Sequence, residues 1–254
     1  MNALQMIRAV ISATVLVCVG QPIAVFAEDV DELVQQATEA AQRGEHDRSI
    51  RLLTRAIDQK SAPPQTWYLR GRENFRAGRI EESVADFDKY VALEPKAESR
   101  LWERCISYYY AGQFAKGAKQ FEDYQKFHDQ DVENSAWRYL CVAREGGVEK
   151  ARATILPIAS DIRVPMMQIY GLYKGKLKPD DVLAFARKDS PNRELENLQL
   201  FYAHLYIGLW YEVGGQADRA KENIFAAEKH KIAHYMWDVA HVHAERLRKN
   251  DKSE

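Results

Sequence analysis

The side chains with the clearest capacity for chemistry are four histidines near the C-terminus: His230, His234, His241 and His243. On a helix, His234, Asp238 and His241 share one face, because their spacings are four and three residues. Two neutral imidazoles and a carboxylate placed in this way could bind zinc. However, no glutamate-flanked zinc-protease motif is present, and histidines at surfaces or helix ends are the commoner explanation. We therefore expect no metal site. A metal-binding protein or enzyme that uses this cluster stays open as an alternative.

Other signatures of catalysis are missing from the sequence. The glycines are dispersed, so they form no glycine-rich phosphate loop, and no Gly-x-Ser-x-Gly nucleophile motif occurs. The chain has 36 basic and 37 acidic residues, which are interleaved and form no stripe that could follow a nucleic-acid backbone. The sequence thus predicts a protein without a catalytic residue, a cofactor or a nucleic-acid partner.

A repeat with a period of 34 residues organises the chain. It is marked by Gly44, Gly78, Gly112 and Gly146. Each glycine ends one helical pattern just before the next begins, where a helix C-terminus often needs a residue with positive φ. The fifth residue after each glycine is small, and the ninth and twelfth are mostly larger and apolar. These three positions form one stripe on a helix. Each unit is therefore expected to be a helix, a glycine turn and a second helix.

The later units follow the same pattern less regularly. The offsets return around Gly208 and Gly215, which leaves room for one degenerate unit between the fourth and the last. Its two helices are expected at 164–173 and 179–188, because Pro179 suits the first turn of a helix. The first helix of the last unit is expected to begin near Ser190 and Pro191 by the same logic. A single closing helix is expected at 232–247, with its charged end fraying into solvent.

The second unit resembles a tetratricopeptide repeat at Trp67, Gly71, Gly78, Ser83, Phe87, Tyr90 and Pro95. The third unit is similar at Leu101, Tyr108, Phe114, Gly117 and Phe121, whereas the first has Leu33 and the fourth Ser135 where the family prefers Trp. The resemblance implies an all-α, right-handed solenoid of about six hairpins with a C-terminal capping helix. The implied repeat domain, 28–247, contains units at 30–63, 64–97, 98–131, 132–165, a degenerate 166–200 and 201–234, then the cap and a charged tail at 248–254.

In this family the first helices of successive repeats line a concave groove that binds peptides or partner helices. The matching positions here are Tyr68, Arg72, Phe75, Arg76, Trp102, Ile106, Tyr109, Tyr110, Leu140 and Arg144. Aromatic residues and arginine carry much of the binding energy in protein interfaces. The resemblance thus implies a protein or peptide partner with apolar and acidic side chains. The alternative is that some of these aromatics are core residues between neighbouring helices.

The first 27 residues have the layout of a secretory signal. Arg8 precedes the mostly apolar run Ala9–Val19, and small residues follow at Val25-Phe26-Ala27. The apolar run is shorter than the ~20 residues of a membrane-spanning helix. We therefore expect signal cleavage and a periplasmic or extracellular location, similar to bacterial periplasmic tetratricopeptide adaptors. An uncleaved membrane anchor is the alternative.

Two cysteines, Cys105 and Cys141, follow this segment among apolar and aromatic neighbours. They are expected to be buried free thiols, although export would make a disulfide chemically possible. Taken together, these features predict a non-catalytic scaffold or adaptor that acts outside the cytoplasm. A self-associating structural protein of the envelope is a further alternative.

Overall fold

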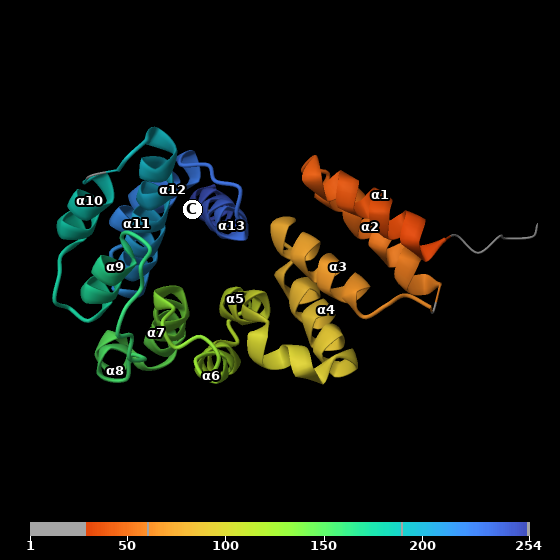
Figure 1. Ribbon diagram of the computed structural model, residues 1–254, viewed down its shortest axis with the longest axis horizontal. Coiled ribbons are helices and arrows are strands. Elements are labelled where there is room, and N and C mark those ends of the chain that lie inside the picture. Colours follow the sequence, from red (N-terminus) through yellow and green to blue (C-terminus); the bar gives the residue numbers. More distant parts are fainter. Residues whose placement is uncertain (1–28, 60, 189, 253–254) are drawn as a thin grey trace, which may run out of the picture.

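The computed structural model describes residues 29–59, 61–188 and 190–252 (Figure 1). The predicted signal segment lies outside these residues. Every regular element within them is a helix, which confirms the predicted all-α class. The helices are α1 (Val30–Gln42), α2 (His46–Asp58), α3 (Gln65–Arg76), α4 (Ile80–Leu93), the short 3-10 helix η1 (Pro95–Arg100), α5 (Trp102–Tyr110), α6 (Phe114–Tyr124), α7 (Val132–Gly146), α8 (Val148–Ala153), α9 (Met166–Tyr173), α10 (Pro179–Arg187), α11 (Arg193–Val213), α12 (Ala217–Lys229) and α13 (Tyr235–Asp251).

Consecutive helices pair as hairpins from α1–α2 to α11–α12, and α13 follows them as a single helix. The turns of the first three hairpins use Gly44, Gly78 and Gly112, with φ of 75°, 72° and 71°. An L side chain is strained at such angles, so glycine is the residue that allows these tight turns. The 34-residue spacing therefore marks a backbone requirement that recurs from unit to unit.

The fourth hairpin departs from the predicted pattern. Gly146 is the last residue of α7, and the positive φ of 86° belongs to Gly147. The second helix, α8, ends at Ala153, so Ile155, expected on that helix, lies in the loop that follows. Pro157 explains the early end, because it lacks an N–H and disfavours helical backbone in the preceding residue. The fourth unit is thus a long helix, a short helix and a loop.

The last helices differ from expectation at their ends. The degenerate unit forms α9 and α10, two residues and one residue shorter than predicted. The next helix, α11, begins at Arg193 rather than at the Ser190-Pro191 step, because Asn192 caps it by accepting a hydrogen bond from the Leu195 N–H at 2.9 Å. The closing helix begins at Tyr235 and continues to Asp251, so most of the charged end expected to fray is helical.

Arginines at equivalent repeat positions link the helices on one side of the array. They are Arg70, Arg104 and Arg138, which are 34 residues apart. Arg70 binds the carboxylate of Asp86 within its own hairpin, whereas the other two bind carboxylates on the preceding hairpin. Those partners are Asp88, 2.8 Å from Arg104, and Glu122, 2.8 Å from Arg138. Charge-assisted hydrogen bonds thus supplement apolar packing between the units.

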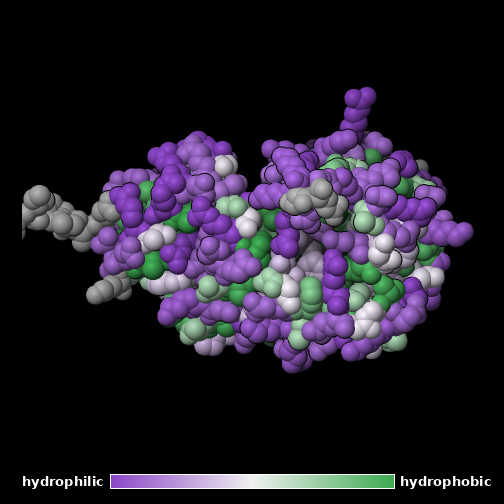
Figure 2. All heavy atoms as spheres, turned by 180° about the vertical axis from the view of Figure 1, so that it is seen from behind, coloured by the Kyte–Doolittle hydropathy of each residue, from purple (hydrophilic) through white to green (hydrophobic). Residues whose placement is uncertain are grey.

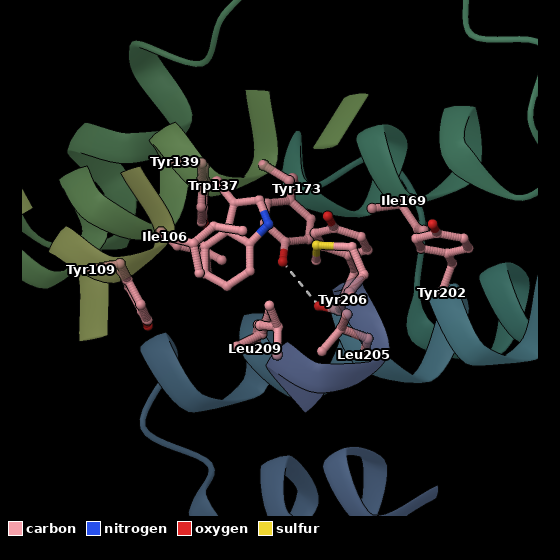
Figure 3. Close-up of a cluster of buried hydrophobic side chains, with 14 of the residues drawn as sticks. Ile106, Tyr109, Trp137, Tyr139, Ile169, Tyr173, Tyr202, Leu205, Tyr206 and Leu209 are labelled. Atoms are coloured by element: carbon pink, nitrogen blue, oxygen red, sulfur yellow. Dashed lines mark hydrogen bonds between the residues drawn. The ribbon is translucent and has the colours of Figure 1, made fainter. Parts of the chain in front are cut away.

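The main hydrophobic core is continuous from Phe75 on α3 to Ala244 on α13. Its centre is rich in aromatic side chains, and Figure 3 shows Trp137, Tyr173 and Tyr206 pointing into one cluster. The Tyr173 hydroxyl donates to the backbone oxygen of Tyr206 at 2.9 Å, which satisfies a polar group inside this core. The N-terminal hairpin has a separate, smaller core.

The array curves so that its two ends approach each other. In Figure 1, α1–α4 form one arm, α9–α12 the other, and α5–α8 connect them. Helix α13 lies between the arms and packs against both α12 and α3. None of the described helices combines the length and apolarity needed to cross a membrane.

Candidate partner-binding groove

Helix α13 lies across the concave side that the repeat pattern predicts as a groove. On α3, the Nε of Arg76 donates to Asp238 at 2.7 Å, and the Phe75 ring lies 5.6 Å from the Tyr235 ring. On α5, the Tyr110 hydroxyl lies 2.9 Å from the Nδ1 of His243. The chain's own last helix therefore occupies part of the predicted groove.

The predicted groove residues consequently differ in exposure. Four are buried: Phe75, Ile106, Tyr109 and Tyr110. Leu140 is fully buried in the main core as well. Tyr68, Arg72, Arg76 and Trp102 are half-buried, and Arg144 is exposed. Five of the ten predicted groove side chains are thus buried in the main core, and the part of all ten in partner binding stays a prediction.

A polar cluster closes the far end of the groove. The Nε of Arg144 donates to the Tyr109 hydroxyl at 3.2 Å, and the same guanidinium lies 2.8 Å from Glu212 on α11. His243 lies 3.4 Å from Glu212. Burial acts to raise the pKa of Glu212, but the hydrogen bond from His243 and the charge of Arg144 outweigh it and lower this pKa to about 2. At this end, Arg144 is occupied by the chain's own carboxylate.

The near end of the concave side stays open as a channel of about 560 Å³. Its walls are α1, α2, α3 and the turn between α12 and α13 together with the first turn of α13. Seen from behind, a notch separates the N-terminal hairpin from the C-terminal half, with hydrophilic side chains on both rims and hydrophobic ones near its base (Figure 2). The channel is wide enough for a chain segment rather than only a small molecule.

Basic side chains outnumber acidic ones in this channel. The lining holds four cations, Arg43, Arg72, Arg76 and Lys231, and two carboxylates, Glu73 and Asp238. Both carboxylates bind Arg76 at 2.5 and 2.7 Å, so they are already paired. Arg43 pairs outside the channel with Glu45 at 2.9 Å.

Arg72 and Lys231 are the channel cations for which no described carboxylate forms an ion pair, although Arg72 Nη1 donates to the Tyr68 hydroxyl at 3.5 Å. The guanidinium of Arg72 lies 4.9 Å from the Tyr235 ring centre and forms no ion pair with any described residue. Its Nε is buried and has no hydrogen-bond partner within the described part of the chain. The ammonium of Lys231 lies 5.0 Å from the Trp237 ring centre. Unpaired buried donors are costly, so Arg72 is well placed to receive an external acceptor.

The histidine cluster does not converge on a common point. The Nδ1 of His234 accepts the N–H of Met236 at 3.2 Å and caps α13. The Nδ1 of His241 lies 2.8 Å from Glu228, whereas Asp238 binds Arg76. Across the described ranges, no three His, Cys, Asp or Glu side chains are placed to hold a metal ion. The zinc alternative therefore lacks the geometry that it needs.

The two cysteines described by the structure are both buried and both free. Burial raises the pKa of the Cys105 and Cys141 thiols well above their usual range. They pack as small apolar side chains in the main core, as expected from their neighbours.

Sequence reasoning missed the wall that the C-terminal segment contributes to the channel. The expected closing helix at 232–247 includes Tyr235 and Trp237, but the sequence predicts no groove role for them or for Lys231. A usable signal was present in α13, where apolar residues occupy more than one face. The buried positions on this helix are Tyr235, Met236, Val239, Ala240, Val242, His243 and Ala244. A cap with one neighbour needs a single apolar stripe, whereas this pattern is typical of a helix covered on two sides.

Comparisons with known proteins agree with the hairpin architecture. A family model for the tetratricopeptide repeat matches residues 34–98, which include α2, α3 and α4. The chain is 25% identical over 122 residues to the Protein SGT1 homolog of Bos taurus, a match that covers 48% of this chain. The chain spans 34%, about a third, of the length of that relative.

Two solved structures also match most of the chain, both at low similarity. One is YrrB, a TPR protein with an unusual peptide-binding site, at 15% identity and a TM-score of 0.44 over 86% of this chain and 93% of that one. The other is TTC0263, a thermophilic TPR protein of Thermus thermophilus, with the same identity and TM-score over 86% of this chain and 100% of that one. Residues 34–98 thus match the tetratricopeptide repeat, and the rest of the described chain continues as helical hairpins followed by the single helix α13.

Proposed function

We propose that this protein is a non-catalytic scaffold that binds an extended, acidic segment of a partner protein in the channel between α1, α3 and the α12–α13 turn. The tetratricopeptide architecture supports the general role, because it presents concave surfaces to other proteins. The channel supports the specific role. It is the part of the concave side that α13 leaves open.

The observation that carries this proposal is the unpaired state of Arg72. Its guanidinium offers hydrogen-bond donors in a half-buried position, and the described residues supply no carboxylate for it. A planar guanidinium binds carboxylates in a bidentate manner, and partial burial strengthens such a contact. Lys231 adds a second positive charge on the opposite wall of the channel. An acidic side chain or a terminal carboxylate of the partner fits between them.

Apolar side chains in the same channel complete the site. Leu53 and Leu69 lie on the side of the N-terminal repeats, and Tyr235 and Trp237 lie on the side of α13. Interfaces gain most of their energy from aromatic and arginine side chains at their centre. The partner segment is therefore expected to alternate acidic and apolar residues, because its successive side chains face different walls.

We further propose that the protein acts outside the cytoplasm. This part of the proposal rests on the charged, apolar and small-residue layout of residues 1–27. The intact mass of the protein from its native cells tests it. Cleavage after Ala27 leaves Glu28 as the first residue, whereas a mass that includes residues 1–27 from a cytoplasmic fraction contradicts export.

Binding is best tested with charge reversal at Lys231. We expect a library of acidic and apolar octapeptides to yield binders whose Kd rises at least about tenfold with Lys231→Glu, because an attraction becomes a repulsion. Lys229→Glu is the matched control, since Lys229 is exposed two residues away and does not line the channel. Fluorescence anisotropy measures both variants, and circular dichroism checks that each is folded.

The variant Arg72→Gln provides a second, independent test of the channel. It removes the charge while keeping a side chain of similar length, and we expect it to weaken the same peptides. Equal affinity in the wild type, Lys231→Glu and Arg72→Gln would contradict the channel as the site. A library dominated by basic peptides would contradict the proposed partner chemistry.

A further inference from the structure

A second, smaller pocket lies deeper on the concave side and has a different character. Its volume is about 170 Å³, and its walls come from α5, α6, α7, the loop before α9 and the start of α13. Four aromatic side chains, Trp102, Phe121, Tyr124 and Trp137, form its apolar part. A cavity of ~150 Å³ accommodates a benzene-sized group, so this pocket has room for one side chain. We call it the aromatic–acidic pocket.

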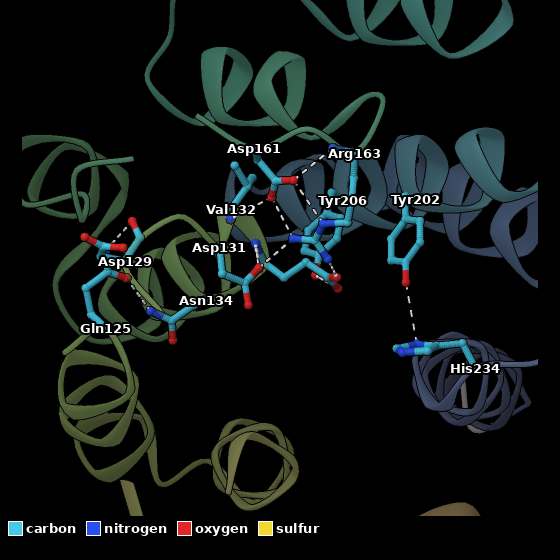
Figure 4. Close-up of polar contacts among 11 residues, drawn as sticks. Gln125, Asp129, Asp131, Val132, Asn134, Asp161, Arg163, Tyr202, Tyr206 and His234 are labelled. Atoms are coloured by element: carbon cyan, nitrogen blue, oxygen red, sulfur yellow. Dashed lines mark hydrogen bonds and ion pairs between the residues drawn. The ribbon is translucent and has the colours of Figure 1, made fainter. Parts of the chain in front are cut away.

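Asn134 brings an unsatisfied acceptor to the lining of this pocket. Its side chain is 3% exposed, and its Oδ1 has no hydrogen-bond partner among the described residues. The orientation of the amide follows from its neighbours. Gln125 uses its Nε2 to donate to the backbone oxygens of Asp129 and Pro157, so its Oε1 must accept from Asn134 Nδ2 at 2.6 Å. The atom without a partner is therefore the Oδ1 of Asn134, a residue that lines the pocket (Figure 4).

The polar side of the pocket has an excess of negative charge. Arg163 is its only guanidinium among the lining residues, and it is shared by Asp131, Glu133 and Asp161 at 2.6–2.7 Å. Four of its five N–H donors bind these three carboxylates. Asp131 accepts through Oδ1, and no described residue donates a hydrogen bond to its Oδ2. Figure 4 shows the Asp131 carboxylate beside Arg163 and the Asn134 amide beside Gln125, both at the start of α7.

The raised pKa of Glu133 is consistent with the excess of negative charge in this pocket. Burial, and next the neighbouring Asp131, raise the pKa of Glu133 to about 7, although Arg163 and the Tyr206 hydroxyl act in the opposite direction. Among the other groups around the pocket, burial lowers the pKa of His234 and raises that of Tyr124 and Tyr202. These three groups are therefore neutral near pH 7, and none of them supplies a positive charge.

We propose that the aromatic–acidic pocket binds a lysine or arginine side chain of a partner protein. The aromatic walls surround the aliphatic stem and attract the cation by cation–π interaction, which acts within about 6 Å of a ring centre. The cationic head donates to the free acceptors, Asn134 Oδ1 and Asp131 Oδ2, and offsets the excess charge around Arg163. His234 lines both this pocket and the channel, so one partner segment can reach both sites.

A neutral amide is the main competing ligand. The Nε1 of Trp137, which also lines the pocket, is buried without a partner among the described residues and could donate to a carbonyl oxygen. An Asn or Gln side chain could then bind between this donor and Asn134. The free acceptors and the negative charge around Asp131 and Glu133 favour a cation, and the experiment compares the two ligands directly.

The test is an NMR titration of the folded protein, following the backbone amide signals of residues 131–134. The probes are blocked amino acids: Nα-acetyl-lysine methylamide, its arginine analogue, the uncharged isostere norleucine and glutamine. We expect the lysine or arginine probe to bind at least about tenfold more tightly than the norleucine and glutamine probes. Equal binding of the glutamine probe would overturn the proposed cation specificity.

A free amine is distinguished by a further probe, n-butylammonium, which has the cationic head but no backbone. We expect it to bind more weakly than the lysine probe, because it lacks the blocked amide groups at the pocket mouth. If it binds as tightly or more tightly, the ligand is a small organic cation and not a partner side chain, and the proposal is wrong.

Asp131→Asn is the decisive variant, because asparagine keeps the capping acceptor of α7 while it removes the charge. We expect the lysine probe to bind about tenfold more weakly to this variant. Asp129→Asn is the matched control, since Asp129 is exposed two residues away and does not line the pocket. Equal losses in the two variants would show a general charge effect and would overturn the proposal. Lys231→Glu changes the channel without touching this pocket, so failure at one site is distinguishable from failure at the other.

Binding should also depend on pH. Because Glu133 becomes protonated as the pH falls below about 7, we expect affinity for the lysine probe to drop about tenfold from pH 8 to pH 6. Protonation of His234 acts in the same direction, so Glu133→Gln separates the two groups. This variant should remove most of the dependence, and an unchanged pH profile would contradict the role of Glu133.

Discussion

The N-terminal hairpin α1–α2 and the C-terminal helix α13 are the two ends of one repeat array, but they are held in different ways. The hairpin has its own small core, formed by Leu33, Ala37, Leu52, Leu53 and Ala56, and packs onto α3. Helix α13 joins the main core and contacts side chains of α3, α5 and α12. In a repeat array, stability comes from neighbouring interfaces, so an end with one neighbour opens more easily. The channel lies between the weakly held end and the strongly held one.

The largest expected effect comes from deleting a side chain of the main core. Trp137→Ala should lower the free energy of unfolding by about 3–5 kcal/mol, because it leaves a large cavity among aromatic residues. Leu53→Ala removes a buried side chain of the hairpin core and should instead speed amide exchange mainly in α1 and α2. Chemical denaturation and hydrogen exchange measure the two effects. Fast exchange throughout α13 in Leu53→Ala would contradict the separation of the two ends.

Glycines in the two regions should respond differently to substitution. Gly208 lies where α11 meets α12, and an added Cβ would lie 2.9 Å from the Ile224 side chain. Gly208→Val should therefore cost about 2 kcal/mol through overpacking. Gly78 has open space around it but a φ of 72°, so Gly78→Ala should cost only about 1 kcal/mol through backbone strain. Thermal unfolding ranks the two, and the reverse order would show that α11 and α12 can separate freely.

The contact between Arg76 and Asp238 ties α3 to α13 and is next in expected size. Both side chains are about 20% exposed, so solvent screens the pair only in part. Asp238→Asn should lower the free energy of unfolding by about 1 kcal/mol and speed amide exchange at the start of α13. A double-mutant cycle with Arg76→Met isolates the pair. A coupling energy of zero would mean that α13 is held by apolar packing alone.

A further expected effect is a change in the slope of stability against pH. The pKa of Glu133 is raised from its usual value of 4.5 to about 7 in the folded protein. The folded state thus binds more protons than the unfolded state between these values. The stabilising contribution is complete below about pH 4.5 and is lost as the pH rises to about 7. In thermal unfolding at several pH values, Glu133→Gln should lose less stability over this range than the wild type. Parallel curves would contradict the assignment.

Much of the fold could be predicted from local patterns. The period of Gly44, Gly78 and Gly112 reports a backbone requirement, and that requirement does not depend on distant contacts. The same reasoning failed at Gly146, because a second glycine follows it directly. Gly147, and not Gly146, adopts the positive φ of the turn. It failed again at Ile155, because Pro157 ends α8 early. These errors arise where a single residue overrides the repeat.

The candidate site could be predicted only on one side. Arg72 and Arg76 were predicted from their repeat positions, and the structure places both in the channel. The opposite wall, at Lys231 and Tyr235, depends on how far the array curves. Arg76 and Asp238 are 162 residues apart, and small rotations accumulate over all the units between them. No local sequence pattern specifies this accumulated rotation.

The central claim is that a partner segment enters the channel, and site-specific photo-crosslinking tests it most directly. A photoreactive amino acid is placed at position 231, which lines the channel, and in a parallel sample at position 229, which does not. We expect a crosslink from position 231 to an acidic partner segment, with competition by an acidic peptide from the library. Crosslinks of equal yield from both positions, or from position 229 alone, would contradict it.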